Sequence, residues 1–322
     1  MIGADLADGV AETLIVPSFT RIGYDLRSLL DGWKSLDEYD LADRTIVLTG
    51  GTSGLGRAAA HRFAAAGATL LIVGRTADRN ETIVSELQEA SGNDSVSQFP
   101  ADMGDLDDVR SLAAHTLASF DRVDVLIHNA GALTPDRRTT PGGLEATVAS
   151  QVVGPFLLTT LLLPALTESE TPRVLTMSSG GMYSEPLTVG MLQMSADDYR
   201  GTAQYARAKR AQVTLNEMWA ERHPDVTFHS LHPGWASTPG VDEALPAFAR
   251  VMGPLLRSAD QGADTLVWLA ADDTVPLQSN GGFWLDRRRR GIHRLGRTRR
   301  TDTADRRDRL WNWVSGAAGL TT

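Results

Sequence analysis

The chain has 322 residues, a formal net charge of -9 at pH 7 and no cysteine. The acidic balance argues against nucleic acid as the main partner, and the absence of cysteine excludes disulfides, thiolate catalysis and cysteine metal sites. Hydrophobic residues make up 42% of the sequence, which is enough to bury a sheet between two layers of helices.

The sequence shows neither an export signal nor an apolar run long enough to span a membrane. The first basic residue is Arg21, and no apolar stretch follows a charged start, so we expect no export signal. The longest apolar run, residues 155–166, is shorter than the roughly 18 residues that a membrane helix needs. We therefore expect a buried core helix there, no membrane span, and a cytoplasmic protein.

Residues 1–40 precede the first predicted strand and are expected to form an N-terminal helical arm. Apolar residues recur there at helical spacing, which predicts a short amphipathic helix whose apolar face is formed by Leu26, Leu29, Leu30, Trp33 and Leu36. Acidic residues outnumber basic ones in this segment. The arm is therefore expected to pack on the domain or on a second subunit, and not on an anionic membrane.

Strand and helix patterns alternate along residues 41–286. Strands are predicted at residues 45–49, 69–73, 96–99, 123–128, 173–178 and 227–232. Asp105 is a predicted helix N-cap, and Gly67 is predicted to follow the C-terminus of the first helix of this region. The alternation predicts an α/β fold: a doubly wound parallel sheet with helices on both faces and ligands beyond the carboxyl ends of the strands.

The first predicted strand leads into a glycine-rich loop. The sequence over residues 45–57 is TIVLTGGTSGLGR, a β-branched strand and a turn with Gly50, Gly54 and Gly56, and an alanine-rich helical stretch follows. Strand, loop and helix in this order are the context of a dinucleotide-binding fingerprint, whose glycines let backbone N–H groups approach a pyrophosphate. The fold is thus expected to be Rossmann-type, with residues 41–286 as an NAD(P)-binding catalytic domain.

The second predicted strand is followed by Gly74 and Arg75. At this point an NAD-binding chain usually offers an acid to the ribose hydroxyls, whereas a basic group accommodates the extra phosphate of NADP. Arg75 therefore favours NADP(H) over NAD(H) as the cofactor. In the alternative, Arg75 is solvated and Asp78 faces the ribose.

Lys209 is one of only two lysines among 31 basic residues, and it follows Tyr205 by four positions. On a helix these two side chains share a face. A nearby cation lowers the pKa of a phenol from about 10 toward the working range. The pair predicts a proton donor, and its alternative is an ordinary pair on a helix surface.

Three histidines lie in or at the end of predicted strands: His128, His229 and His232. The strand period of two places residues 229 and 232 on opposite faces, and no carboxylate cluster accompanies them. We expect core or cofactor-flanking histidines and no metal site.

Five motifs occur in a fixed order: Thr49-Gly-x3-Gly-x-Gly56, Asn129-Ala-Gly131, Ser179, Tyr205-x3-Lys209 and Pro233-Gly234. Together they resemble the short-chain dehydrogenase/reductase family, over about residues 42–285. The 26-residue spacing from Ser179 to Tyr205 resembles its retinol-dehydrogenase-like branch. The arm and the segments at 178–182, 232–240 and 259–264 look like the subgroup of dehydrogenase/reductase family member twelve.

The resemblance implies an oxidoreductase that moves hydride between a nicotinamide and a carbonyl or alcohol substrate. Tyr205 would be the general acid/base, Ser179 would hydrogen-bond the substrate oxygen, and Lys209 would lower the phenol pKa and bind the nicotinamide ribose. Gln151 stands where the family has an asparagine that helps a water chain reach the lysine. This departure leaves a catalytically weak NADP(H)-binding regulatory or scaffold protein as the alternative. A homodimer or homotetramer is also implied.

The same resemblance implies a set of cofactor contacts along the strand ends. Besides Tyr205 and Lys209, Gly50, Ser53, Gly54, Leu55 and Gly56 would line the pyrophosphate, Arg75 the 2′-phosphate, Asp102 the adenine edge and Asn129 the adenine-side ribose, and Thr238 would lie by the carboxamide or the pyrophosphate. The implied contacts also include Thr52, Met103, Ala130, Gly131, Pro233 and Gly234.

Two regions carry the remaining expectations. Apolar side chains of the 180–204 insertion and of the segment after Thr238 either line a pocket for a lipophilic substrate or pack the loops down: Met182, Tyr183, Leu187, Met191, Leu192, Met194, Leu245, Phe248 and Met252. Residues 287–322 are expected to form a C-terminal extension, with eleven arginines between Arg287 and Arg309 and then Trp311 and Trp313. Such a charge run is typical of a solvated surface, and a cover over the NADP phosphates or a subunit contact is the alternative.

Overall fold

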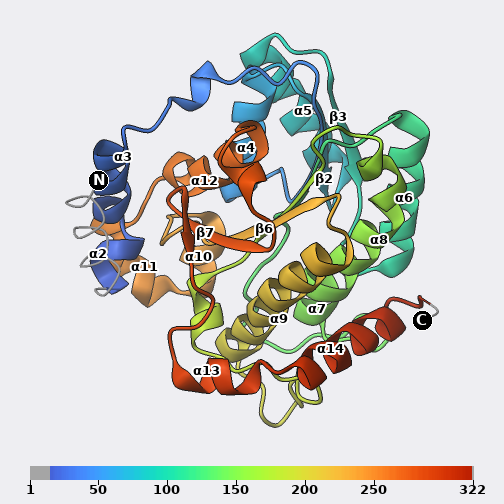
Figure 1. Cartoon of the computed structure of the whole chain (residues 1–322), viewed down its shortest axis with the longest axis vertical. Helices are drawn as coiled ribbons and strands as arrows, with labels where there is room; N and C mark the ends of the chain where they lie inside the picture. Colours follow the sequence, from blue (N-terminus) through green and yellow to red (C-terminus); the bar gives the residue numbers. More distant parts are fainter. Residues whose placement is uncertain (1–14, 321–322) are drawn as a thin grey trace.

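An eight-stranded sheet lies at the centre of the computed structural model, which describes residues 15–320 (Figure 1). The sheet order is β3-β2-β1-β4-β5-β6-β7-β8, and only the β7–β8 pair is antiparallel. The strands are β1 (Thr45–Thr49), β2 (Thr69–Gly74), β3 (Val96–Pro100), β4 (Val125–His128), β5 (Arg173–Met177), β6 (Thr227–Leu231), β7 (Gly282–Leu285) and β8 (Arg288–Arg290). The predicted Rossmann-type parallel sheet is confirmed, whereas β7 and β8 were not predicted.

Helices cover both faces of this sheet. One layer holds α4 (Gly54–Ala65), α5 (Ala77–Ser91) and α12 (Ala259–Ala271), and the other holds α6 (Leu106–Ser119), α8 (Gly154–Thr167), α9 (Gly201–Arg222) and α14 (Ala304–Ala317). Neighbouring residues of β1 point to opposite layers, so that Val47 belongs to one apolar cluster and Ile46 to the other. This two-sided burial explains why the apolar residues of β1, β2 and β4 follow one another without alternating with polar ones.

The shorter elements connect these layers. They are the 3-10 turns η1 (Leu36–Glu38), η3 (Gly180–Tyr183), η4 (Gly253–Leu255) and η5 (Pro276–Gln278), and the helices α10 (Pro239–Ala244), α11 (Pro246–Met252) and α13 (Gly296–Thr301). Asp105 caps α6 as predicted, because its side chain accepts a hydrogen bond from Asp107 N at 2.9 Å. Gly67 follows α4 with a φ of 85°, which also agrees with the prediction.

One long apolar helix packs on the face of the sheet that α6, α9 and α14 also cover. It consists of α7 (Ala146–Val148), the π-helical turn η2 (Ala149–Val153) and α8. It has 22 residues, and the mean hydropathy of its most apolar 18-residue window is 1.6, so by length and composition alone the helix could cross a membrane. In the structure 72% of its most apolar window is buried inside the protein, which agrees with the core helix predicted at 155–166.

The N-terminal arm contains α2 (Ile15–Phe19) and α3 (Arg21–Asp31), and the part of the predicted arm before residue 15 lies outside the described residues. The predicted helix is present, but its predicted packed face is only partly correct, because Leu26, Trp33 and Leu36 are half-buried whereas the other two leucines are exposed. Leu29 is 81% exposed and Leu30 is 39% exposed, whereas Arg27 is fully buried. Arg27 turns inward because its guanidinium forms an ion pair with the buried carboxylate of Asp286.

The arginine-rich C-terminal segment packs on the rest of the protein. Arg287 forms an ion pair with Asp264, and Arg307 forms one with Glu217 on α9. Leu310 of α14 is fully buried in the apolar core. The interpretation of this run as a solvated surface is therefore wrong for these residues, because acids of the domain pair with its charges.

Candidate active site

The strand order reverses between β1 and β4, because β2 and β3 lie on one side of this pair and β5 to β7 lie on the other. In a doubly wound sheet, ligands bind beyond the carboxyl ends of the strands at such a switch point. The glycine loop after β1 and the segment 129–131 after β4 both begin there. The fold thus brings two of the predicted motifs to one edge of the sheet.

Two glycines of the loop after β1 allow no side chain. Gly50 has a φ of 70°, and a Cβ atom added at Gly56 would lie 2.1 Å from Gly50 O. The Asn129 amide fills the space beside them, since Nδ2 donates to Thr49 O at 3.0 Å and to Gly50 O at 3.1 Å. Asn129, predicted as a ribose contact, therefore ties the end of β4 to the glycine loop.

The first turn of α4 faces the same edge. Ser53 is the exposed N-cap of α4, and its side chain makes no capping hydrogen bond. Thr238 lies beside the loop, because a Cβ atom added at Gly54 would be 3.4 Å from the Thr238 Cβ. A helix N-terminus with free N–H groups binds a pyrophosphate readily. The loop and this helix end therefore fit a dinucleotide.

Two arginines follow β2, of which only one was predicted as a site residue. Arg75 is exposed directly after the strand, and Asp78 is exposed in the first turn of α5. Arg79 Nη2 donates to Thr52 O at 3.3 Å, so this guanidinium reaches back to the glycine loop. Sequence reasoning missed Arg79, although a second arginine four residues after Arg75 could have indicated another basic group near the glycine loop.

The two predicted site residues in the turn after β3, Asp102 and Met103, both contact other residues of the protein. Asp102 Oδ1 accepts a hydrogen bond from Gly104 N at 2.8 Å. Met103 is 4% exposed, and its carbonyl oxygen lies so close to Gly154 that an added Cβ atom would be 2.0 Å away. Asp102 itself stays exposed and can still face a ligand.

Ser179 and Tyr205 come together from different elements. Ser179 follows β5 and caps η3, where its Oγ accepts a hydrogen bond from Gly181 N at 3.2 Å. Tyr205 lies in the first turns of α9. A hydrogen bond to the Ser179 side chain lowers the pKa of Tyr205, but burial of the phenol outweighs it and raises the pKa from 10.0 to about 12.

Ser178 has a different environment from Ser179. Its side chain is buried, and its Oγ donates to Lys209 O at 3.3 Å. Ser178 therefore faces α9, and Ser179 is the serine that meets Tyr205.

Lys209 lies one helical turn after Tyr205 on α9. Its Nζ lies 5.2 Å from the centroid of the Tyr205 ring and donates to Met177 O at 2.8 Å. Burial lowers the pKa of Lys209 from 10.5 to about 7. The predicted net lowering of the phenol pKa is not found, because burial disfavours the charged forms of both side chains.

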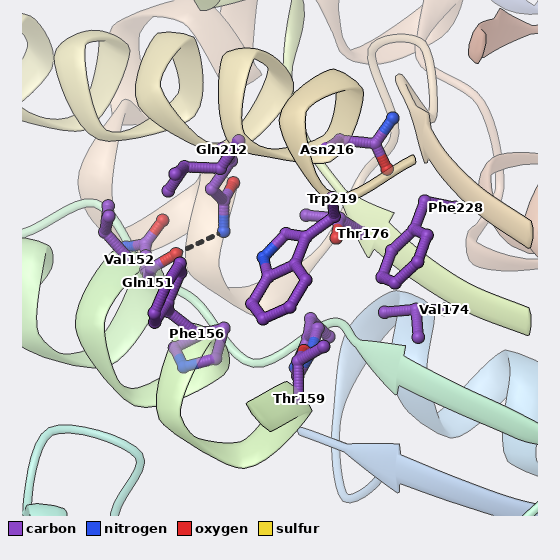
Figure 2. Close-up of a pocket in the computed structure, with 13 residues that line it drawn as sticks. Gln151, Val152, Phe156, Thr159, Val174, Thr176, Gln212, Asn216, Trp219 and Phe228 are labelled. Carbon is purple, nitrogen blue, oxygen red and sulfur yellow. Dashed lines mark hydrogen bonds between the residues drawn. The ribbon is translucent and has the colours of Figure 1, made fainter. Parts of the chain in front are cut away.

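Gln151 lies in the π-helical turn η2 and is 1% exposed. Its Nε2 donates to Ala132 O at 2.8 Å, so the amide is directed to the segment after β4. The backbone carbonyl of Gln151 accepts a hydrogen bond from Gln212 Nε2 at 2.6 Å (Figure 2). Gln212 is a neighbour that sequence reasoning missed, since the two residues are far apart in the chain.

A cavity lies beside this pair, between α8, α9 and β5 (Figure 2). Polar and aromatic side chains line it, including Asn216 and Trp219. Several buried polar atoms around it have no partner within the protein: His128 Nδ1, Gln151 Oε1, Gln212 Oε1 and both amide atoms of Asn216. Such atoms favour ordered water in this cavity.

The three strand histidines are buried and separate. His128 Nε2 lies 2.7 Å from Thr159 Oγ1, and His229 Nε2 lies 2.9 Å from Pro276 O. Burial lowers the pKa of His128 to about 3 and that of His229 to about 4. Within residues 15–320 no three His, Asp or Glu side chains are grouped to hold a metal ion.

The apolar residues of the 180–204 insertion mainly pack the loop down. Met191 is 59% exposed, whereas the others are buried: Met182, Tyr183, Leu187, Leu192 and Met194. In the segment after Thr238, Leu245, Phe248 and Met252 are only half-buried. Of the residues predicted to line a pocket, those that keep exposed apolar surface are therefore Met191 and the three in the segment 245–252.

Comparison with known proteins decides the family. The model of the short chain dehydrogenase family matches residues 44–247. The chain belongs to the short-chain dehydrogenase/reductase family. It is 39% identical to "Dehydrogenase/reductase SDR family member 12" of Homo sapiens over 256 residues, which are 80% of each chain. It is 32% identical to "Polyprenol dehydrogenase" of Homo sapiens over 255 residues, which are 76% of each chain.

A solved structure from Mycobacterium Paratuberculosis has the same fold, with a TM-score of 0.69 and 25% identity, and the match covers 89% of this chain and 98% of that one. The chain is thus an oxidoreductase of this family, whose members use a nicotinamide cofactor. The glycine loop, the free N-terminus of α4 and the Ser179–Tyr205–Lys209 group fit that cofactor and its chemistry.

Proposed function

We propose that the chain is an NADP(H)-dependent oxidoreductase that interconverts a carbonyl and an alcohol on a lipophilic substrate. The observation that carries this proposal is the meeting of the Ser179 and Tyr205 side chains, which come from the end of β5 and from α9, with Lys209 behind them. A hydroxyl, a phenol and an amine in one place are suited to moving one proton at a carbonyl oxygen.

Each of the three residues has a separate task in this proposal. Tyr205 donates a proton to the carbonyl oxygen in reduction and takes it back in oxidation. Ser179 hydrogen-bonds the same oxygen and holds it within reach of the phenol. When bound, the nicotinamide supplies or accepts the hydride. Lys209 has a pKa of about 7, so it can carry a positive charge near neutral pH while Met177 O fixes its position.

The preference for NADP(H) is supported by Arg75 and Arg79. Both lie at the carboxyl end of β2, where a basic group accommodates the 2′-phosphate, and Arg79 also contacts the glycine loop. Guanidinium groups bind phosphates through charge-assisted hydrogen bonds. The exposed Asp78 keeps NAD(H) as the less favoured alternative.

The lipophilic substrate is supported by the segment 239–255. Val251 is 76% exposed there, and Leu245, Phe248 and Met252, which follow Thr238 in the chain, are half-buried. The name of the related polyprenol dehydrogenase refers to a lipophilic alcohol. An apolar surface beside a polar reactive centre suits a long or polycyclic substrate with one carbonyl group.

Gln151 favours a second candidate, a catalytically weak NADP(H)-binding protein. Its side-chain Nε2 donates to Ala132 O and its backbone carbonyl accepts from Gln212 Nε2, so both of these atoms are engaged within the protein, whereas its Oε1 has no partner there. The test uses the full chain with NADPH or NADH and a panel of long-chain and polycyclic ketones and aldehydes. Faster turnover with NADPH supports the proposed enzyme, whereas tight NADPH binding without turnover of any compound supports the second candidate.

A further inference from the structure

The N-terminal arm reaches the loop that carries Ser179. Phe19, at the end of α2, is 4% exposed, and its ring meets the His232 ring edge-on with 4.5 Å between the centroids. A Cβ atom added at Gly180 would lie 3.2 Å from Phe19 Cε2 and 2.8 Å from His232 Nε2. Because Gly180 directly follows Ser179, the Phe19 ring forms part of the support of the catalytic loop.

Phe19 also holds the loop after β6. Trp235 N donates to Phe19 O at 2.7 Å, and the two rings meet edge-on at 5.7 Å. The Trp235 ring in turn meets Phe248 of α11 at 5.2 Å. This row of three aromatic rings links the arm to the loop of Pro233 and Gly234 and to the apolar segment 239–255.

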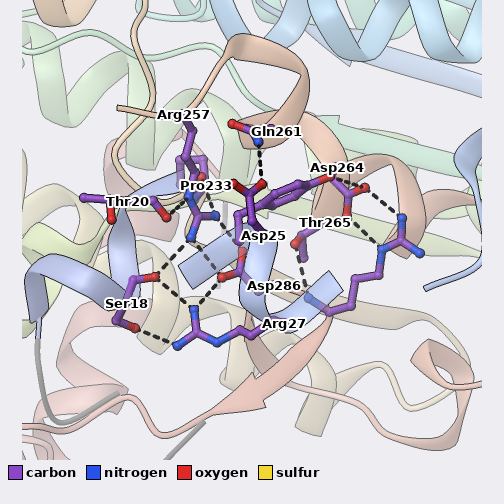
Figure 3. A network of polar contacts seen from close by, with 12 residues as sticks. Ser18, Thr20, Asp25, Arg27, Pro233, Arg257, Gln261, Asp264, Thr265 and Asp286 are labelled. Atoms are coloured by element: carbon purple, nitrogen blue, oxygen red, sulfur yellow. Dashed lines mark hydrogen bonds and ion pairs between the residues drawn. The ribbon is translucent and has the colours of Figure 1, made fainter. Parts of the chain in front are cut away.

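A buried ion network holds the arm in this place (Figure 3). Asp286 accepts hydrogen bonds from Arg27 Nη1 and Arg257 Nη1, each at 2.5 Å, and both arginines also donate to Ser18 O, at 2.9 and 3.1 Å. The side chains of Arg27, Arg257 and Asp286 are at most 1% exposed. We call these three residues the arginine clamp. Because Ser18 precedes Phe19, the clamp fixes the backbone that carries the ring.

The arginine clamp contacts the loop after β6 as well. Arg257 Nη1 donates to Pro233 O at 3.3 Å, and Arg257 N donates to Trp235 O at 2.8 Å. Gly234 has a φ of 77°, and a Cβ atom added there would lie 2.2 Å from Arg257 Nε. The guanidinium therefore packs directly against the turn of Pro233 and Gly234, which the family resemblance counts among the cofactor contacts.

We infer that Phe19 is a positioning residue of the active site: seated by the arginine clamp, it fixes the Ser179 loop and the 233–238 loop relative to each other. The inference rests on the proposed function for its effect on turnover. Phe19 has no proton to exchange, so it acts only through the loops that it touches. A shift of a catalytic group by about 1 Å can cost on the order of 100-fold in rate, which makes such a support consequential.

The test compares Phe19→Ala, Phe19→Leu and the control Trp33→Leu in the full chain. Trp33 is also an aromatic residue of the arm, but it packs against Tyr24 and Arg287. We expect Phe19→Ala to lower kcat on the order of tenfold, and Phe19→Leu to recover most of this loss because it restores apolar bulk. Hydrogen–deuterium exchange should accelerate at residues 178–184 and 233–238 in Phe19→Ala and remain unchanged there in Trp33→Leu.

Equal exchange and equal kcat in Phe19→Ala and Trp33→Leu, at comparable losses of thermal stability, would overturn the inference. The exchange readout does not depend on turnover. If the wild-type protein turns over no carbonyl compound, the proposed function fails, and the exchange of the two loops alone then decides whether Phe19 positions them.

Discussion

Lys209 Nζ lies 5.2 Å from the centroid of the Tyr205 ring while it donates to Met177 O at 2.8 Å. Tyr205 and Lys209 belong to α9, whereas Met177 is the last residue of β5 and is followed by Ser178 and Ser179. One hydrogen bond therefore fixes the helix that carries Tyr205 to the strand that precedes Ser179. The same burial that makes this bond strong lowers the pKa of the lysine.

The lowered pKa of Lys209 predicts a pH-dependent stability. Between about 7, the pKa in the folded state, and 10.5, its ordinary value, the unfolded chain binds more protons at this site than the folded chain does. The free energy of unfolding should therefore increase as pH rises from 7 to 10, relative to Lys209→Met, which cannot titrate. Thermal unfolding of both proteins over this range measures it, and a pH-independent difference in Tm would refute the assignment.

The two arginines after β2 predict a selective effect on cofactor affinity. Arg75→Ala and Arg79→Ala should each weaken NADPH binding by roughly 10- to 100-fold, the range for losing a hydrogen bond to a charged group, and leave NADH binding nearly unchanged. Arg57→Ala is the matched control, because Arg57 lies in α4 and pairs with Glu86. Titration with both cofactors checks this, and equal losses for NADPH and NADH would contradict it.

The arginine clamp predicts an uneven cost of removing arginines. Arg27→Met leaves a buried charge with one partner fewer and should lower the free energy of unfolding by about 3–5 kcal/mol. Arg62 forms an exposed ion pair with Asp37, so Arg62→Met should cost at most about 1 kcal/mol. Urea unfolding of the two variants provides the comparison. Similar small losses would show that the arginine clamp adds little to stability.

Local patterns in the sequence were sufficient to predict most of the sheet and to select the candidate residues of the site. Uninterrupted apolar strands, the glycine spacing and the Tyr205–Lys209 spacing each depend on neighbours in the chain, so they can be read without coordinates. The family resemblance then placed Ser179 opposite Tyr205. In the structure Ser179 lies close enough to Tyr205 for its side chain to lower the phenol pKa, and the catalytic roles of the two residues stay a prediction.

Long-range pairing and burial could not be read in the same way. The leucines of α3 suggested its packed face, but the partner that buries Arg27 is Asp286, 259 positions away in the chain. The predicted lowering of the Tyr205 pKa was wrong, because burial raises this pKa and burial is a property of the whole fold. Strand β8 was missed because three consecutive arginines carry no strand pattern, and because β8 is the edge strand of the sheet and pairs only with β7.

The central claim, that Tyr205 is the proton donor beside Ser179, is tested most directly by Tyr205→Phe in the full chain. With a carbonyl compound that the wild-type protein reduces, kcat should fall by about 100- to 10,000-fold while NADPH affinity stays nearly constant, because only the transferable proton is lost. Tyr39→Phe, which removes a phenol bonded to Asp272, should retain wild-type turnover. Near-wild-type kcat in Tyr205→Phe would contradict the claim.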